Sequence, residues 1–402
     1  MELLKNVIDF ATAKKLLLEN LKQVERVEVL GIADAGFRVL AEDIVSQVDV
    51  PPFNRAAMDG YAVIAEETAG AKAIEPITLR KIGEVHAGDM PVIHVMRGTC
   101  VQIATGAAMP EGSDAVVMVE HTEVEEGSET VKIYSPVRKG ENVTRAGEDI
   151  KKGTVVIKRG EVLTPGKIGA LAAIGREKVR VYEKPRVAII PTGNEILKPG
   201  EQLRPGKIYD VNTYTLASLI QFAGAVPVIY PVVADEMDAL KKALVEALKT
   251  DLVLFAGGSS VGERDLIVKV LSNAELLFHG IAVKPGKPTL CAKVNGKIVL
   301  GMPGYPTSCL TNAYALLLSA LGKLTRREIQ LRRVKAKMGR RVASTIGRLQ
   351  FLPVKLDGEL AIPVFKESGA ITSMADAHGY IEIPENVDVV EKGEEVEVVM
   401  FL

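Results

Sequence analysis

The sequence predicts a multidomain α/β and β protein, in which a doubly wound α/β core domain is combined with a β-rich insert domain, a connecting neck and a small C-terminal β-barrel. Three observations favour this fold class. The 402 residues suffice for about three domains. Runs rich in β-formers alternate with helical periods between residues 186 and 321, and short alternating strands follow Arg332.

The α/β core shows the clearest local pattern. Buried strands are expected at residues 186–190, 226–230 and 251–255, and helices at 210–223, 235–248, 265–271 and 306–318. Leu240, Leu244 and Leu248 repeat every four residues, as on one face of a helix. Asn295-Gly296 predicts a hairpin turn between two further strands. Strands that alternate with helices are typical of a parallel sheet with crossover helices.

The rest of the chain has a different pattern. Residues 48–146 open with Pro51-Pro52 and contain many glycines and short β runs, which predicts a β-rich insert that interrupts the neck. The expected division is a helix at 1–23 that packs on the α/β domain, a neck at 24–47 and 147–180, the insert at 48–146, the α/β domain at 181–330 and the barrel at 331–402.

Composition and charge limit the function classes. Fifty Lys and Arg residues nearly cancel 51 Asp and Glu, so no global field attracts nucleic acid or anionic lipid, and any anion must be bound locally. The basic stretch at 325–341 has no aromatic residue for base stacking and is interpreted as a solvated face. No apolar run is long enough for a membrane span. Three widely spaced cysteines indicate a reducing compartment, so a cytoplasmic location is expected.

Candidate binding loops follow the strands of the predicted sheet. In parallel sheets, ligands bind outside the carboxyl ends of the strands. Polar or glycine-rich loops fall there at residues 191–195, 257–265 and 302–306 and around Asp235. Gly257, Gly258 and Ser260 offer backbone N–H groups and a hydroxyl to a phosphate, although a tight strand-to-helix turn explains this loop equally well.

Two lysines and three carboxylates stand near these loops. Lys284 and Lys287 lie in a proline-bounded loop and are candidates to bind phosphate or another oxyanion, with solvated surface lysines as the alternative. Glu195, Asp235 and Asp265 would repel a polyanion unless a divalent cation bridges them. Mg²⁺ is expected, because it combines one or two carboxylates with phosphate oxygens. A structural role for Asp235 as a helix N-cap is the alternative.

The insert contains two further candidate segments. Asp59 lies between Met58 and Gly60 just before a β run, and Thr105-Gly106 forms a second polar loop. A carboxylate in such a place favours a function, although turn chemistry explains each segment about equally well.

Together these segments resemble the MoeA family, the molybdopterin molybdenumtransferases, which include the C-terminal domain of gephyrin. The resemblance covers nearly the whole chain. It is carried by MDGYAV at 58–63, TGAxxPxGxDAVVMVE at 105–120, GEDIxxG at 147–153, TGxE at 192–195, IYDxN at 208–212, GGxSVGExD at 257–265, KPGKP at 284–288 and PGxPxS at 303–308.

The MoeA resemblance implies a homodimer that places molybdate or tungstate on adenylylated molybdopterin and releases AMP in a Mg²⁺-dependent step, with active sites shared between subunits. It implies catalytic roles for Asp59, Glu195, Asp235 and Asp265, of which the last three would hold Mg²⁺. The implied substrate-binding residues are Thr105, Asp149, Thr192, Gly257, Gly258, Ser260, Lys284, Lys287, Pro303, Pro306, Arg348 and Ser368. For Arg348 and Ser368, packing or turn roles are the alternative.

The chain departs from the usual MoeA pattern at Ala56, Asn194, Tyr305 and His378, where Ser, Asp, Asn and Asn are common. Tyr305 is the departure expected to affect the choice of ligand most, because its bulky phenol stands beside the predicted nucleotide rim. Two alternatives stay open: a molybdopterin adenylyltransferase, which shares the α/β core but lacks the insert, and a gephyrin-like scaffold without turnover. The adenylyltransferase and molybdoenzymes are also expected as partners.

Overall fold

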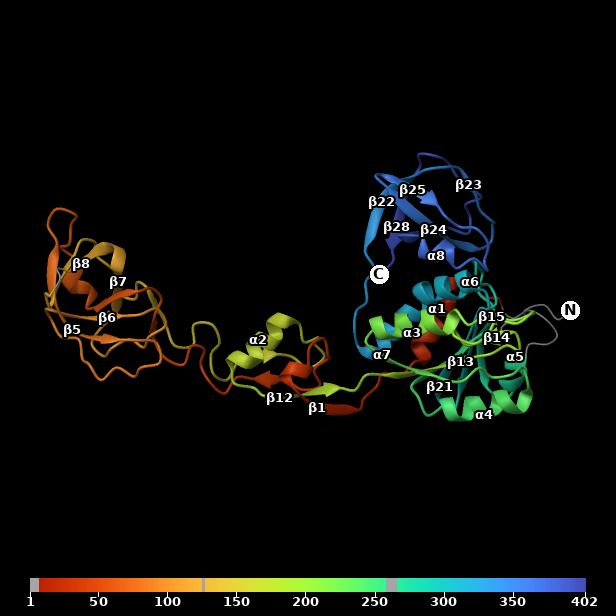
Figure 1. The fold of residues 1–402 in the computed structure, drawn as a ribbon, viewed down its shortest axis with the longest axis horizontal. Helices are drawn as coiled ribbons and strands as arrows, with labels where there is room; N and C mark the ends of the chain where they lie inside the picture. Colours follow the sequence, from red (N-terminus) through yellow and green to blue (C-terminus); the bar gives the residue numbers. More distant parts are fainter. Residues whose placement is uncertain (1–6, 125–126, 258–265) are drawn as a thin grey trace. The chain divides into compact units, whose positions relative to one another are not determined.

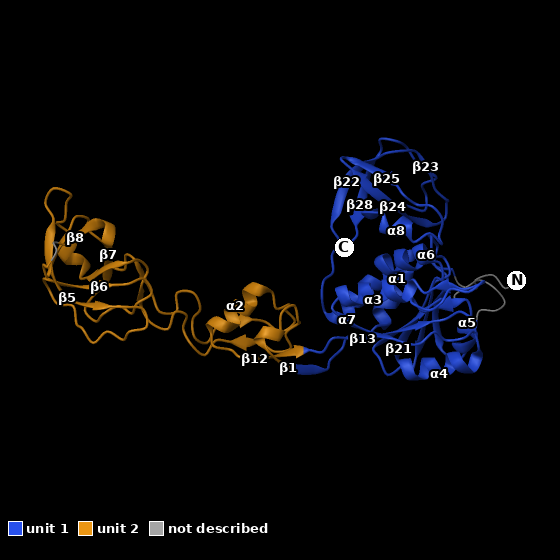
Figure 2. Cartoon of the chain, viewed as in Figure 1, with its two compact units in different colours: residues 1–28, 182–402 blue, residues 29–181 orange. Residues whose placement is uncertain are grey.

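The computed structural model describes residues 7–124, 127–257 and 266–402, and the chain divides into two compact units. Unit 1 comprises residues 1–28 and 182–402, and unit 2 comprises residues 29–181 (Figure 2). Each unit has hydrophobic cores of its own, made from residues of that unit.

Unit 1 is built around a six-stranded sheet (Figure 1). Its strand order is β16 (Val226–Ile229), β13 (Arg186–Pro191), β17 (Leu252–Ala256), β21 (Lys297–Met302), β20 (Leu290–Val294) and β18 (Glu275–His279). The first four strands are parallel, and β20 and β18 are antiparallel to their neighbours. Asn295 and Gly296 join β20 to β21 with φ angles of 49° and 76°, which a tight hairpin turn requires.

Helices cover both faces of this sheet. The core on one face includes α1 (Phe10–Asn20), α3 (Asn212–Phe222), α6 (Pro306–Asn312) and α7 (Leu318–Thr325), and the core on the other includes α4 (Met237–Ala247) and α5 (Leu266–Val270). Along β13, Val187 and Ile189 belong to the first core and Ala188 and Ile190 to the second. A strand buried on both faces must be apolar throughout, which explains the continuous run in the sequence. The doubly wound α/β core is confirmed.

The N-cap interpretation of Asp235 is wrong. α4 begins at Met237, and its N-cap residue is Glu236, which has an extended backbone conformation. Asp235 instead donates its backbone N–H to Oδ1 of Asn194 at 3.2 Å. Asp235 therefore belongs to the loop that precedes the helix, and its side chain is exposed.

The C-terminal part of unit 1 is a small closed β-barrel, as predicted. β24 (Leu349–Asp357), β25 (Leu360–Pro363), β22 (Arg333–Met338), β28 (Glu395–Met400) and β26 (Gly379–Ile383) pair in this order, and β26 pairs back onto β24. The barrel core contains Met338, Val354, Ile381 and Val398. The short strand β19 (Val283–Lys284) adds to the barrel sheet in parallel with β24. This pairing attaches the barrel to the α/β part.

Unit 2 contains the predicted β-rich structure. Its six-stranded sheet has the order β7 (Ala115–Met118), β4 (Gly60–Val63), β6 (Thr99–Ile103), β5 (Ile77–Val85), β9 (Thr130–Ile133) and β8 (Thr122–Val124), with buried apolar residues on both faces. A separate small core joins α2 (Pro165–Ala173) to the paired strands β2 (Ile44–Val45) and β11 (Val155–Ile157). In the described part of the chain, no helix combines the length and apolar character needed to cross a bilayer.

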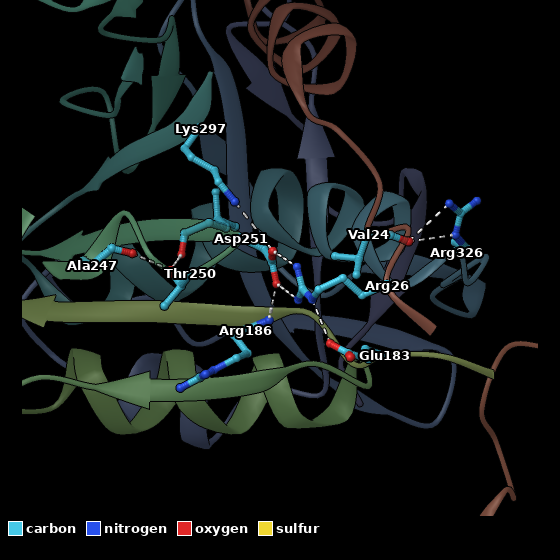
Figure 3. A network of polar contacts seen from close by, with 10 residues as sticks. Val24, Arg26, Glu183, Arg186, Ala247, Thr250, Asp251, Lys297 and Arg326 are labelled. Atoms are coloured by element: carbon cyan, nitrogen blue, oxygen red, sulfur yellow. Dashed lines mark hydrogen bonds and ion pairs between the residues drawn. The ribbon is translucent and has the colours of Figure 1, made fainter. Parts of the chain in front are cut away.

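A charged network lies just before β17 in unit 1 (Figure 3). The Asp251 side chain is 8% exposed, and its carboxylate accepts two hydrogen bonds of 2.9 Å from the Arg26 guanidinium. It accepts a third, of 2.8 Å, from the Arg186 N–H. Burial by itself raises the pKa of Asp251, but the hydrogen bonds outweigh burial and hold this pKa below its ordinary value. Arg26 also contacts Glu183 at 2.7 Å, which ties two distant segments to the start of the sheet.

Candidate functional site

Loops from three strands of the unit 1 sheet meet at the carboxyl ends of those strands. Thr192 follows β13, Gly257 follows β17, and Gly304 comes shortly after β21. A Cβ placed on Gly257 would lie 2.6 Å from the carbonyl oxygen of Thr192, and one on Gly304 would lie 4.0 Å from Gly257 Cα. Gly257 has a φ of 120°, which side-chain-bearing residues rarely adopt. A glycine at this position therefore permits the close approach of the three loops.

Two of the predicted carboxylates lie on neighbouring loops of this rim. The Glu195 carboxylate oxygens lie 2.8 and 2.9 Å from where a Cβ on Gly193 would be, so the side chain folds over the start of its own loop. The Asn194 side chain accepts the Asp235 N–H, which joins the loop of Glu195 to the loop of Asp235. Both carboxylates are exposed and accessible to a ligand.

The donor set at the rim suits Mg²⁺ held jointly with a substrate. Within residues 7–124, 127–257 and 266–402, no group of three or more His, Cys, Asp or Glu side chains could hold a metal ion. Glu195 and Asp235 supply two carboxylates, and Mg²⁺ typically combines one or two of these with phosphate oxygens and water. Asp265, the third predicted ligand, lies outside the described residues, as do Gly258 and Ser260.

In the described part of the chain, four buried side-chain atoms have no hydrogen-bond partner: Thr192 Oγ1, Asn212 Oδ1, Thr213 Oγ1 and Asn312 Oδ1. Thr192 lies on this rim, whereas Asn312 donates to the carbonyl of Gly286, in the loop of Lys284 and Lys287. At the start of α3, Asn212 donates from Nδ2 to the carbonyl of Gly304 at 2.8 Å. An unpaired buried polar group costs about 1–3 kcal/mol, so such atoms are markers of functional regions. Asn212 belongs to the IYDxN segment but is absent from the residues predicted to bind substrate.

Lys284, Lys287 and Arg348, which we call the cation corner, lie where the barrel attaches to the α/β part of unit 1. Lys284 in β19 pairs with Gln350 in β24. Arg348 comes directly before β24, two residues ahead of Gln350. Val283, the other residue of β19, is buried in the core. Lys287 follows on the same proline-bounded loop as Lys284.

The cation corner has no acidic partners among the residues that the structure describes. All three side chains are half-buried, and none of them forms an ion pair with a carboxylate of the described ranges. The one polar side-chain contact of Lys284 found there is from Nζ to Thr345 Oγ1, at 3.1 Å. Cations without carboxylate partners repel one another, so the corner is suited to a small anion.

The segment at Ser368 contacts the start of α6. Thr307 donates its backbone N–H to the carbonyl of Ser368 at 3.0 Å. The ring of Tyr305 lies 3.7 Å from where a Cβ on Gly369 would be, and Tyr305 is 68% exposed. Pro303 and Pro306 flank Tyr305 in the sequence, so these prolines and Ser368 belong to one region of unit 1.

In unit 2 the structure brings Asp59 and Thr105 into direct contact. Asp59 Oδ1 accepts hydrogen bonds from the Thr105 N–H at 2.7 Å and from its hydroxyl at 2.9 Å. These two bonds, the backbone one first, lower the pKa of Asp59, so this exposed carboxyl is ionised at neutral pH. A cavity of about 140 Å³ lies beside Asp59 and is also lined by Glu84, His86 and Gln102.

Asp149 is placed differently from these two residues. Its backbone N–H donates to the carbonyl of Val50 at 3.0 Å, and its side chain is exposed. None of the contacts found among the described residues joins Asp149 to Asp59 or Thr105. Of the three residues predicted for the insert, the structure therefore brings Asp59 and Thr105 together but not Asp149.

Family models match most of the chain. They are "MoeA N-terminal region (domain I and II)" over residues 8–175, "Probable molybdopterin binding domain" over 188–323, and "MoeA C-terminal region (domain IV)" over 335–401.

Similar proteins also extend over nearly the full chain. A relative from Methanocaldococcus jannaschii, named for molybdopterin biosynthesis, is 37% identical over 415 residues, with all of both chains covered. A molybdopterin molybdenumtransferase from Staphylococcus aureus is 33% identical over 372 residues, covering 90% of this chain and 88% of the relative. A crystal structure of a molybdopterin biosynthesis MoeA protein from Pyrococcus horikoshii gives a TM-score of 0.86 at 41% identity, covering 98% of this chain and 99% of that chain.

Proposed function

Because the chain belongs to the MoeA family, we propose that it is a molybdopterin molybdenumtransferase, which places molybdate or tungstate on adenylylated molybdopterin and releases AMP. The observation that carries this proposal is the cation corner, which lacks acidic partners within the described ranges. Such a group of cations is suited to bind a tetrahedral dianion. The corner and the carboxylate rim belong to the same unit.

The predicted residues divide between two ends of the substrates. The oxyanion is bound by Lys284, Lys287, Arg348 and Ser368, whereas the nucleotide end lies along Thr192, Gly257, Pro303 and Pro306, with Gly258 and Ser260 as further predictions outside the described residues. Positively charged side chains and backbone N–H groups stabilise negative charge that develops on a leaving phosphate. Fixed cations near the rim therefore suit cleavage of a phosphoanhydride.

Mg²⁺ completes the proposal. Glu195 and Asp235, together with Asp265, would hold the ion along with phosphate oxygens of the substrate. When bound, Mg²⁺ neutralises charge on the leaving phosphate. The chain itself keeps the first two carboxylates on neighbouring loops, because the Asn194 side-chain oxygen accepts the Asp235 N–H. The backbone carbonyl of Asn194 accepts a hydrogen bond from the Lys207 ammonium.

The assembly and location of the protein are parts of the same proposal. The MoeA likeness supports a homodimer in which one copy acts on substrate held by the α/β part of a second copy. The acting residues would be Asp59, which is exposed and ionised, and Thr105 beside it. A monomer in sedimentation equilibrium would contradict this part.

The three cysteines are buried and free, which suits a reducing cytoplasm. The molybdopterin adenylyltransferase and molybdoenzymes are the partners that would supply the substrate and take the product.

The test is AMP release from adenylylated molybdopterin, measured with and without molybdate, tungstate and Mg²⁺. We expect release to depend on the oxyanion, and we expect Glu195→Ala to slow it by about 10²–10³-fold, as for loss of one preorganised electrostatic group. Glu246→Gln is the control: it alters an exposed ion pair between Glu246 of α4 and Lys249, and it should keep the wild-type rate.

Two other outcomes would contradict the transferase proposal. Stoichiometric binding of adenylylated molybdopterin without AMP release would indicate a scaffold. Formation of adenylylated molybdopterin from ATP and molybdopterin would indicate an adenylyltransferase.

A further inference from the structure

Lys284, one of the three residues of the cation corner, has a long side chain whose ammonium group contacts the hydroxyl group of Thr345. Its Nζ donates to Thr345 Oγ1 at 3.1 Å, in a partly buried contact between residues 61 positions apart. Thr345 lies outside the eight short motifs that carry the MoeA resemblance, although it falls within the match to the MoeA C-terminal region. Its contact with a predicted oxyanion ligand comes from the fold alone.

The loop that carries Thr345 is itself anchored. It follows β23 (Val342–Ala343), which pairs with β27 (Val389–Val390). The Ser344 hydroxyl lies 3.1 Å from Gln350 Oε1, within hydrogen-bond distance. Gln350 is 6% exposed and is the residue that pairs with Lys284 between β24 and β19. The segment that carries Thr345 is therefore tied, through Ser344 and Gln350, to the strand pair that contains Lys284.

We propose that Thr345 is a positioning residue that holds the Lys284 ammonium ready to bind the substrate oxyanion. An ammonium has three N–H donors, so one bond to Thr345 leaves two for the ligand. A lysine side chain loses considerable rotamer freedom when it is immobilised, and a lysine that is already held loses less of it on binding. This inference rests on the proposed function, in which Lys284 binds the oxyanion.

The experiment is calorimetric titration of the full chain with sodium molybdate. Thr345→Val keeps the shape of the side chain but removes the acceptor, and we expect it to raise the Kd about three- to tenfold, as for loss of one hydrogen bond. Thr345→Ser keeps the hydroxyl and should stay within about twofold of wild type. Thr372→Val is the matched control, because Thr372 accepts a similar bond from Lys366 Nζ, at 2.9 Å, in an exposed pair.

A double-mutant cycle with Lys284→Met separates positioning from structural support. If Thr345 acts through Lys284, Thr345→Val should not change the Kd further in the Lys284→Met background. An equal Kd for wild type and Thr345→Val, or an undiminished effect of Thr345→Val without Lys284, would overturn the positioning role. If Lys284→Met itself leaves the Kd unchanged, the oxyanion site of the proposed function fails as well. Circular dichroism and thermal unfolding of each variant show whether it is folded.

Discussion

Single residues in this protein take their charge state from immediate neighbours, and Asp59 is the clearest example. Thr105 supplies both hydrogen bonds that lower the pKa of the Asp59 carboxyl, although the two residues are 46 positions apart in the chain. An ionised carboxylate accepts hydrogen bonds or a proton but donates none. Asp59 is therefore equipped to act as an acceptor towards a substrate group at neutral pH.

We predict that Thr105→Val raises the pKa of Asp59 towards its ordinary value. The variant loses the hydroxyl bond to the carboxylate but keeps the backbone N–H bond, so the shift should be partial. Titration of the Asp59 carboxyl ¹³C resonance measures it. Thr122→Val, which removes a hydroxyl bonded to the Val119 carbonyl in the same unit, is the control and should leave the titration unchanged. An unshifted pKa in Thr105→Val would show that its hydroxyl does not set the charge state.

At the scale of elements, the sheet of unit 1 is held at its start by Asp251. Its carboxylate binds Arg26 and the Arg186 N–H while only 8% of the side chain is exposed (Figure 3). Lys297 at the start of β21 lies 3.7 Å away. One carboxylate thus joins the starts of β13, β17 and β21 to the segment that contains Arg26.

We predict that Asp251→Asn lowers the free energy of unfolding by about 2–3 kcal/mol at pH 7, because hydrogen bonds to charged groups are lost in a buried site. The folded-state pKa of Asp251 is lowered, so its contribution is present above the unfolded value of about 3.9 and is lost as the pH falls through the folded value. The difference between variant and wild type should therefore shrink below about pH 4.

Urea unfolding followed by circular dichroism at pH 7 and at pH 3 measures both effects. Glu246→Gln breaks an exposed ion pair with Lys249 and should change stability by no more than about 0.5 kcal/mol. A loss for Asp251→Asn as small as this control, or one that does not change with pH, would contradict the role of Asp251.

The elements of the α/β core could be predicted because each has a simple pattern. The strand expected at 186–190 is β13 (Arg186–Pro191), and the helix expected at 210–223 is α3 (Asn212–Phe222). A strand covered on both faces is continuously apolar, and a helix on a sheet repeats its apolar residues every three or four positions. The prediction of Asp235 as the N-cap of α4 is wrong. Asp235 and Glu236 are both acceptable near a helix start, and the sequence does not decide which backbone conformation each adopts.

The candidate site could be predicted in part. The sequence indicates Lys284 and Lys287 because prolines bound their loop, and Asp59 because a carboxylate between Met58 and Gly60 is unusual for a turn. The contact of Lys284 with Thr345 could not be predicted, since it depends on the parallel pairing of the two-residue strand β19 with β24. Such a short strand leaves no periodic pattern in the sequence.

At the scale of the whole molecule, the net charge is nearly zero, but positively and negatively charged side chains are distributed unevenly. Fifty basic residues balance 51 acidic ones, yet the cation corner has no carboxylate partner within the described ranges, whereas Glu195 and Asp235 expose carboxylates at the rim. A polyanionic substrate and Mg²⁺ together would satisfy both groups of charges. The oxyanion is the ligand that distinguishes this protein from an adenylyltransferase or a scaffold.

The most direct test of this central claim is anomalous diffraction at a tungsten absorption edge from crystals of the full chain soaked in sodium tungstate. We predict an anomalous peak at the cation corner, with tungstate oxygens about 3 Å from Lys284 Nζ and the Arg348 guanidinium beside them. The peak should be lost in crystals of Lys284→Met. A tungstate peak elsewhere in the chain, with none at the cation corner, would contradict the proposed site of the oxyanion.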